Sequence, residues 1–147
     1  MNQYHADYLM KNKNGFITIL VMIWIFVLSI GLMTLTHIYI QYTREIESQY
    51  GILKSRYLAQ SGLSVAKVNW NSISIQNIPQ NDEKKWIYEH LNLAHHPNLE
   101  LDGDIYLMKT ASTFYSISKT KQGYRCIIKT SYLYENNTII FSNQEVL

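Results

Sequence analysis

The chain has 147 residues, with 13 lysines and arginines against 11 acidic residues, and a formal net charge of +2. This mild positive charge occurs in no block of like charges, so strong binding to nucleic acid is not indicated. The single cysteine, Cys126, excludes an intrachain disulfide. Because Cys126 alternates with Tyr124 and Ile128 in a strand-like run, we expect a small core residue there and not a reactive thiol.

An uncharged apolar stretch dominates the N-terminal part of the chain. No Asp, Glu, Lys or Arg occurs between Lys13 and Arg44, and about 20 apolar residues in a helix can cross ~30 Å of hydrocarbon. Lys11 and Lys13 precede the stretch, and positive flanks stay in the cytoplasm. The sequence therefore predicts one transmembrane helix over residues 16–43, with the N-terminus inside and the rest of the chain outside. Residues 1–10 show no periodicity and are expected to be unstructured.

The helical pattern continues beyond the predicted membrane segment. Ile46, Tyr50, Leu53 and Tyr57 recur at spacings of four, three and four, which is one stripe of a helix with 3.6 residues per turn. We therefore expect a single long helix whose second half, residues 44–71, is amphipathic and lies in water.

Small residues mark two places on this predicted helix. Ala59, Gly62 and Ala66 form a face on which a sheet or another helix can pack closely. Gly31 lies in the apolar half, where it is either a tolerated small residue or a notch that lets another helix approach. The sequence leaves these two interpretations of Gly31 open.

A polar loop and a short helix follow. Residues 72–81 are polar and are predicted to form a loop. Residues 82–93 are predicted to form an amphipathic helix, with Asn81 or Asp82 as its N-cap and Glu83 in the first turn, where the helix dipole favours a negative charge.

The C-terminal part, residues 104–143, has the alternation that is typical of strands. Asp102-Gly103 is a hairpin signal, and turn residues separate the runs that follow. We expect an antiparallel meander that packs on the long helix, an α+β fold with a globular head over residues 72–147. The strands are predicted over residues 105–110, 113–119, 124–134 and 138–142, with turns at Lys121-Gln122-Gly123 and Glu135-Asn136-Asn137.

Signatures of catalysis are missing from the sequence. It has no GxSxG, no glycine-rich phosphate loop and no HExxH, so we expect neither an enzyme nor a cofactor. His90, His95 and His96, with Asp102 and Asp104, are the candidate metal ligands. Adjacent histidines in a loop do not have the spacing of ligands on one helix face, so we favour the absence of a metal site.

The start of the apolar helix resembles the processing site of type IV pilins and pseudopilins. The matching residues are Lys13-Asn14-Gly15, followed by Phe16 at the head of the uncharged run. The resemblance implies a leader of residues 1–15, cleavage by a prepilin peptidase after Gly15, and methylation of the Phe16 amine. It also implies a pilin-like fold. Most members carry Glu at the fifth mature position, whereas this chain has Leu20, and the tip-located minor pseudopilins also lack that Glu.

A second segment, residues 57–63, resembles the Ala-Glu-x-Gly-type segment of the large minor pseudopilins. Its Gln60-Ser61-Gly62 is closer still to the Gln-x-Gly segment of a minor pilin of Gram-positive competence pili. The resemblance implies a minor subunit of a competence-type pilus for DNA uptake, at or near the tip and active in assembly initiation. The implied partners are major and other minor pilins, the prepilin peptidase, membrane lipid and, indirectly, the assembly platform, its ATPase and DNA.

Two alternatives remain. Besides the minor pilin of a competence-type pilus, the chain could be a single-pass membrane-anchored extracellular binding protein outside any filament, or a minor pseudopilin of a type II secretion system. Only the pilin-type readings require cleavage after Gly15. In all pilin-type readings the protein lies in the bacterial cell membrane and reaches the cell surface after assembly. The residues assigned to assembly or packing are Leu20, Gly31, Ala59, Gln60, Gly62 and Ala66.

Overall fold

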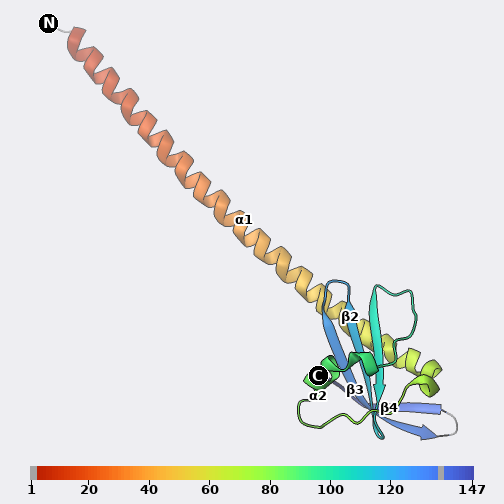
Figure 1. Ribbon diagram of the computed structural model, residues 1–147. Helices are drawn as coiled ribbons and strands as arrows, with labels where there is room; N and C mark the ends of the chain where they lie inside the picture. Colours follow the sequence, from red (N-terminus) through yellow and green to blue (C-terminus); the bar gives the residue numbers. More distant parts are fainter. Residues whose placement is uncertain (1–2, 136–137) are drawn as a thin grey trace. The chain divides into compact units, whose positions relative to one another are not determined.

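The structure, a computed structural model, describes the backbone of residues 3–135 and 138–147, and side chains from residue 15 onward (Figure 1). It confirms the predicted α+β class: a long N-terminal helix and a four-stranded antiparallel sheet. The helical elements are α1 (Gln3–Asn69), the 3-10 turn η1 (Trp70–Ser72), α2 (Glu83–Glu89) and the 3-10 turn η2 (Leu91–Leu93). The strands are β1 (Gly103–Lys109), β2 (Thr113–Thr120), β3 (Arg125–Glu135) and β4 (Thr138–Val146).

The chain divides into two compact units, one ending at Ile46 and the other comprising Glu47–Leu147. The first unit is helical. The prediction that residues 1–10 are unstructured is wrong from Gln3 onward, where α1 already begins. The physical reason is that residues 3–10 contain neither Gly nor Pro, so no residue there stops the helix.

The helix ends close to the predicted position, and Lys109 of β1 caps that end. The Lys109 ammonium donates a hydrogen bond of 2.9 Å to the Trp70 carbonyl and lies 4.6 Å from the centre of the Trp70 ring. A cation is favoured at a helix C-terminus, where unpaired carbonyls gather. Burial lowers the pKa of the Lys109 side chain below its ordinary value.

The sheet is a simple meander in the order β1-β2-β3-β4. Its strands match the predicted runs, but β4 is longer and continues to Val146. The predicted turn at Lys121-Gln122-Gly123 is confirmed, and Gly123 supplies the positive φ of 92° that such a turn requires. The other predicted turn falls on Asn136 and Asn137, outside the described residues. A bulge interrupts the β3–β4 ladder between Lys129 and Ser131.

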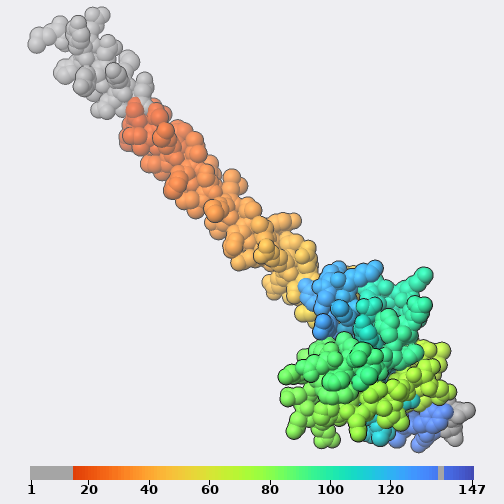
Figure 2. Space-filling view, in the orientation of Figure 1, coloured from red at the N-terminus to blue at the C-terminus, as the bar shows by residue number. Residues whose placement is uncertain are grey.

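Two hydrophobic clusters lie on opposite faces of the sheet. Neighbouring residues of a strand point to opposite faces, and Ile127 and Ile128 accordingly belong to different clusters. The cluster on the α1 side includes Cys126, which is buried as predicted. The other cluster is built around Ile87 of α2, and Figure 2 shows the green segment that contains α2 covering the face turned toward the viewer.

Three local predictions differ from the structure. The predicted helix over residues 82–93 is shorter, because α2 ends at Glu89 and η2 follows. Asp82 occupies the N-cap position, but with a φ of 62° its side chain makes no capping hydrogen bond.

The hairpin signal at Asp102-Gly103 is also wrong, since Gly103 begins β1 and no described strand directly precedes it. The Asp102 carboxylate instead forms ion pairs with Lys54 and with Lys121. Gly103 is required by close packing, because an added Cβ would lie 2.7 Å from the Lys119 carbonyl oxygen.

Candidate functional site: the apolar helix and its packing on the sheet

The apolar part of α1 is exposed along its whole length. All side chains from residue 15 to residue 42 are exposed, including Phe16 and Leu20. Within the described part of the chain, one helix is long and apolar enough to cross a membrane. Lipid or the helices of other proteins can therefore cover these side chains.

The polar side chains of this segment bond to the helix itself. Ser29, Thr34, Thr36 and Thr43 each donate a hydrogen bond of 2.8–2.9 Å to the carbonyl four residues earlier. A polar group without a partner in hydrocarbon costs several kcal/mol, on the order of a lost hydrogen bond or more. These bonds therefore make the segment compatible with a lipid environment despite its hydroxyl groups.

The predicted processing junction and Gly31 lie on regular helix. α1 passes through Gly15 and Gly31 without a break, and a Cβ added at either position would meet no atom within 4 Å. Neither glycine is therefore required by packing within the described chain. The space beside Gly31 is open, and the structure leaves both interpretations of this residue available.

The small residues Ala59, Gly62 and Ala66 of α1 lie at its contact with the sheet. Ala59 and Ala66 are completely buried. A Cβ added to Gly62 would overlap the Ser116 hydroxyl and lie 3.0 Å from Cγ2 of Ile105. The helix backbone thus approaches the sheet so closely that Gly62 has no room for a side chain.

Sequence reasoning missed the hydroxyl groups that join the sheet to this face. Ser116 of β2 donates a hydrogen bond of 2.6 Å to the Ala59 carbonyl, and Ser118 donates one of 2.6 Å to the Ser55 carbonyl. All four residues are buried. The sequence contains the signal: Ser116 and Ser118 alternate on one face of β2, and the small residues Gly51, Ser55 and Ala59 are spaced by four along α1.

The apolar stripe that marked the second half of the helix does not face the sheet. Tyr50, Leu53 and Tyr57 are 63%, 50% and 64% exposed. If these large side chains faced the sheet, they would hold the helix too far from β2 for the serine hydroxyls to reach the helix carbonyls. The face with the small residues packs on the sheet for this reason. Gln60 is also exposed, so unlike Ala59 and Gly62 it does not pack inside the head.

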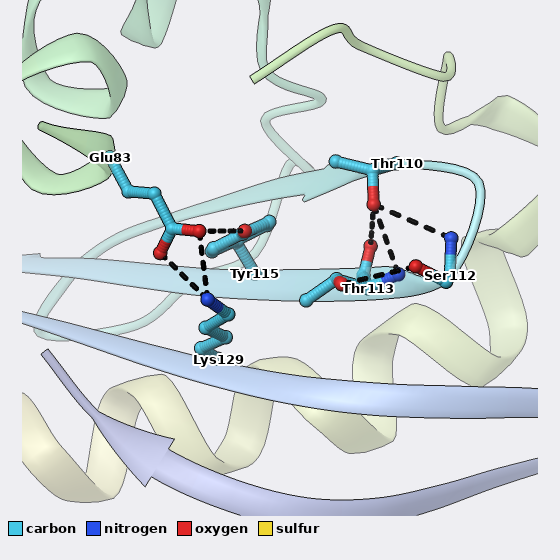
Figure 3. Close-up of polar contacts among 6 residues, drawn as sticks. All are labelled: Glu83, Thr110, Ser112, Thr113, Tyr115 and Lys129. Carbon is cyan, nitrogen blue, oxygen red and sulfur yellow. Dashed lines mark hydrogen bonds and ion pairs between the residues drawn. The ribbon is translucent and has the colours of Figure 1, made fainter. Parts of the chain in front are cut away.

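An ion pair fixes α2 to the opposite face of the sheet (Figure 3). The Lys129 ammonium lies 2.7 and 2.8 Å from the two Glu83 carboxylate oxygens, and the Tyr115 hydroxyl donates to Glu83 over 3.3 Å. Burial, together with the negative charge of Glu83, raises the pKa of Tyr115. The sequence placed Glu83 in the first turn of a helix, but its partner Lys129 lies 46 residues away.

Most of the candidate metal ligands make other contacts, whereas His95 Nε2 is buried without a hydrogen-bond partner among the residues that the structure describes. His90 Nδ1 lies 2.9 Å from the Trp86 carbonyl, and its ring stacks on Trp86 at 4.3 Å. His96 pairs with Asp104 at 3.5 Å. Among the residues for which the structure describes side chains, no group of three or more His, Cys, Asp or Glu could hold a metal ion.

Comparison with known proteins yields no assignment. No family model, curated protein or solved structure matches the chain. The function therefore has to be argued from the helix, the sheet and the contacts between them.

Proposed function

We propose that the chain is a minor pilin or pseudopilin, a structural subunit that is held in the membrane by residues 16–43 before assembly. One observation carries the proposal. The uncharged helix that follows Gly15 continues without a break into the head, where the sheet packs on the same helix. This arrangement is compatible with a pilin-like fold.

A simple membrane anchor needs no such continuity. Here Ala59, Leu63 and Ala66 of α1 form one wall of the core, so the helix that carries the apolar segment also completes the head. A small head buries little surface by itself. The sharing of one helix between membrane segment and core therefore supports an assembly subunit over an anchored binding protein.

Leu20 supports placement at or near the tip of a filament. By family resemblance, a carboxylate at the fifth mature position faces the N-terminal amine of a neighbouring subunit. A buried charge without a partner costs several kcal/mol, whereas a buried pair is tolerated. Leu20 offers no carboxylate, so this subunit is poorly suited to repeat along a shaft and suited to a position that needs no such partner.

A competence-type pilus for DNA uptake is the preferred context because of the Gln60-Ser61-Gly62 segment. Gly62 serves the core of the head, but Gln60 is exposed and available to a neighbouring subunit. Deletion of the gene should abolish transformation and leave protein secretion unchanged. Loss of secretion with normal transformation would assign the chain to a type II secretion system instead.

Processing at Gly15 tests the proposal. Mass spectrometry of the wild-type protein should find an N-terminus at Phe16, methylated by family resemblance. Gly15→Val should leave a full-length protein in the membrane. Gly31→Val is the matched control, because Gly31 is also a helix glycine with no atom within 4 Å of its missing Cβ, and this variant should be processed normally. An intact Met1 start in cells that contain the peptidase would favour the anchored binding protein.

A further inference from the structure

The peptide bond between Gly15 and Phe16 lies inside a helix. α1 begins at Gln3 and passes through both residues without a break. In an α-helix the backbone N–H and C=O groups form a continuous ladder of hydrogen bonds. The Gly15 carbonyl and the Phe16 amide therefore belong to this ladder, and an enzyme that acts on this bond meets a wound backbone.

Hydrolysis of this bond requires access to the Gly15 carbonyl carbon. One water supplies the oxygen of the new Gly15 carboxylate, the bond to the Phe16 nitrogen breaks, and the two water protons convert this nitrogen into a free ammonium group. Peptidases commonly act on a locally opened form of their substrate and not on closed regular structure. The helix must therefore open at Gly15 before cleavage.

Three poor helix formers precede the bond. Asn12, Asn14 and Gly15 rank low in helix propensity, whereas Leu9 and Met10 rank high. Asparagine side chains also compete with the helix by bonding to nearby backbone groups. Asparagine and glycine are both accepted at the N-cap, so Asn14 or Gly15 can cap the helix that remains when the leader unwinds.

The two sides of the bond differ in how easily they can unwind. A Cβ added at Gly15 would meet no atom within 4 Å, so no packing contact in the described part of the chain holds the helix closed at this residue. With residues 16–43 in the membrane, unwinding beyond Phe16 would leave backbone groups without partners in lipid. Residues 11–15 include Lys11 and Lys13 and lie in water, which can bond to the freed groups.

We propose that residues 12–15 are a weak point at which α1 unwinds on the leader side, and that this unwinding exposes the Gly15–Phe16 bond and sets the rate of processing. The inference rests on the proposed function, which supplies the peptidase and the bond that it cuts. When opening and closing are fast relative to cleavage, the rate follows the population of the open form. Helix propensity at Asn12 and Asn14 then controls how fast the protein matures.

The test incubates the full-length precursor, in detergent micelles, with membranes that contain the prepilin peptidase, and mass spectrometry follows the appearance of the Phe16 N-terminus. Asn12→Ala combined with Asn14→Ala should slow processing about tenfold, or about threefold for each substitution, because alanine strengthens the helix. Asn12→Gly combined with Asn14→Gly removes the same amide groups but weakens the helix, and should be processed at least as fast as the wild type. Gly31→Ala, which strengthens the helix far from the bond, should leave the rate unchanged.

Amide hydrogen exchange of residues 12–15 gives a second measurement that does not involve the peptidase. Exchange there should be about tenfold slower in the double alanine variant than in the wild type, and unchanged exchange would overturn the proposal. Slower processing in both the alanine and the glycine variants would mean that the peptidase recognises the asparagine side chains, and equal rates in all variants would mean that unwinding does not control cleavage. Either result overturns the inference but leaves the proposed function intact, because cleavage after Gly15 still occurs. A wild-type chain that the peptidase does not cut would refute both.

Discussion

Substitution of Gly62 by alanine tests the contact on which the head depends. In an isolated helix this change is favourable by about 1 kcal/mol. Here the new methyl group would overlap the Ser116 hydroxyl and press on Ile105 at 3.0 Å. Overpacking of this kind costs about 1–3 kcal/mol. Displacement of the Ser116 hydroxyl also breaks its buried hydrogen bond to Ala59, at a cost of about 1–3 kcal/mol. We expect a net loss of about 1–5 kcal/mol in the free energy of unfolding.

The assay is urea unfolding of a fragment that begins at Arg44, which we expect to be soluble and to unfold cooperatively without the apolar half. Far-UV circular dichroism reports the helix and sheet. Fluorescence of the fragment's two tryptophans, Trp70 and Trp86, reports tertiary packing, because the Trp70 ring lies 5.7 Å from Phe114 and 4.7 Å from Tyr132, and the Trp86 ring stacks on His90. If the slope of the unfolding free energy against urea concentration is unchanged, the substitution has altered stability alone.

A double-mutant cycle separates overlap from other effects. Ser116→Ala alone should cost about 0.5–1.5 kcal/mol for the lost hydrogen bond. In the double variant the hydroxyl is gone, so Gly62→Ala should cost about 1–3 kcal/mol less than it does alone. Gly51→Ala is a useful comparison, since the three atoms nearest to its added Cβ all belong to the half-buried ring of Tyr124, which can move. A Gly62→Ala fragment as stable as the wild type would refute the close-packing argument.

Two further predictions concern pH and the filament. The folded chain retains the Tyr115 proton to a higher pH than the unfolded chain, whose tyrosine pKa is near 10.0; the unfolded state then binds fewer protons, so stability falls as pH rises above that value. Tyr115→Phe should reduce this fall between pH values of about 9 and 11, and urea midpoints that decline equally in both proteins would contradict it. Leu20→Glu should be neutral for assembly or allow incorporation along the shaft, as read by gold labelling of the head; a requirement for Glu at this position, or even labelling of the wild type along the shaft, would refute the tip placement.

Local patterns in the sequence were sufficient to predict the long helix and the strands, and part of the contact between the helix and the sheet. The uncharged run predicts the apolar part of α1, alternation predicts the strands, and the spacing of Ala59, Gly62 and Ala66 predicts the packed face. The orientation of the helix could not be read from its most apolar stripe. Tyr50, Leu53 and Tyr57 have the larger hydrophobic surface. The sheet nevertheless packs on the face with Ala59, Gly62 and Ala66, because small side chains let the helix backbone come close to the strands.

Contacts between residues that are far apart in the sequence could not be predicted from local patterns. The pairing of Glu83 with Lys129 depends on where β3 places its side chains relative to α2, and the sequence offers no periodicity for such a pair. Asp102-Gly103 shows the opposite failure. Its composition is typical of a tight turn, but the tertiary contacts of Asp102 with two lysines and the narrow space at Gly103 explain the same residues.

The most direct test of the proposed function is mass spectrometry of the filament fraction sheared from the surface of cells that express the protein. We predict that this fraction contains the chain with a methylated Phe16 N-terminus, in few copies relative to the major pilin, and that the Gly15→Val variant is missing from it. A chain that occurs only in the membrane fraction, with its Met1 start intact, would contradict the assignment as a pilus subunit.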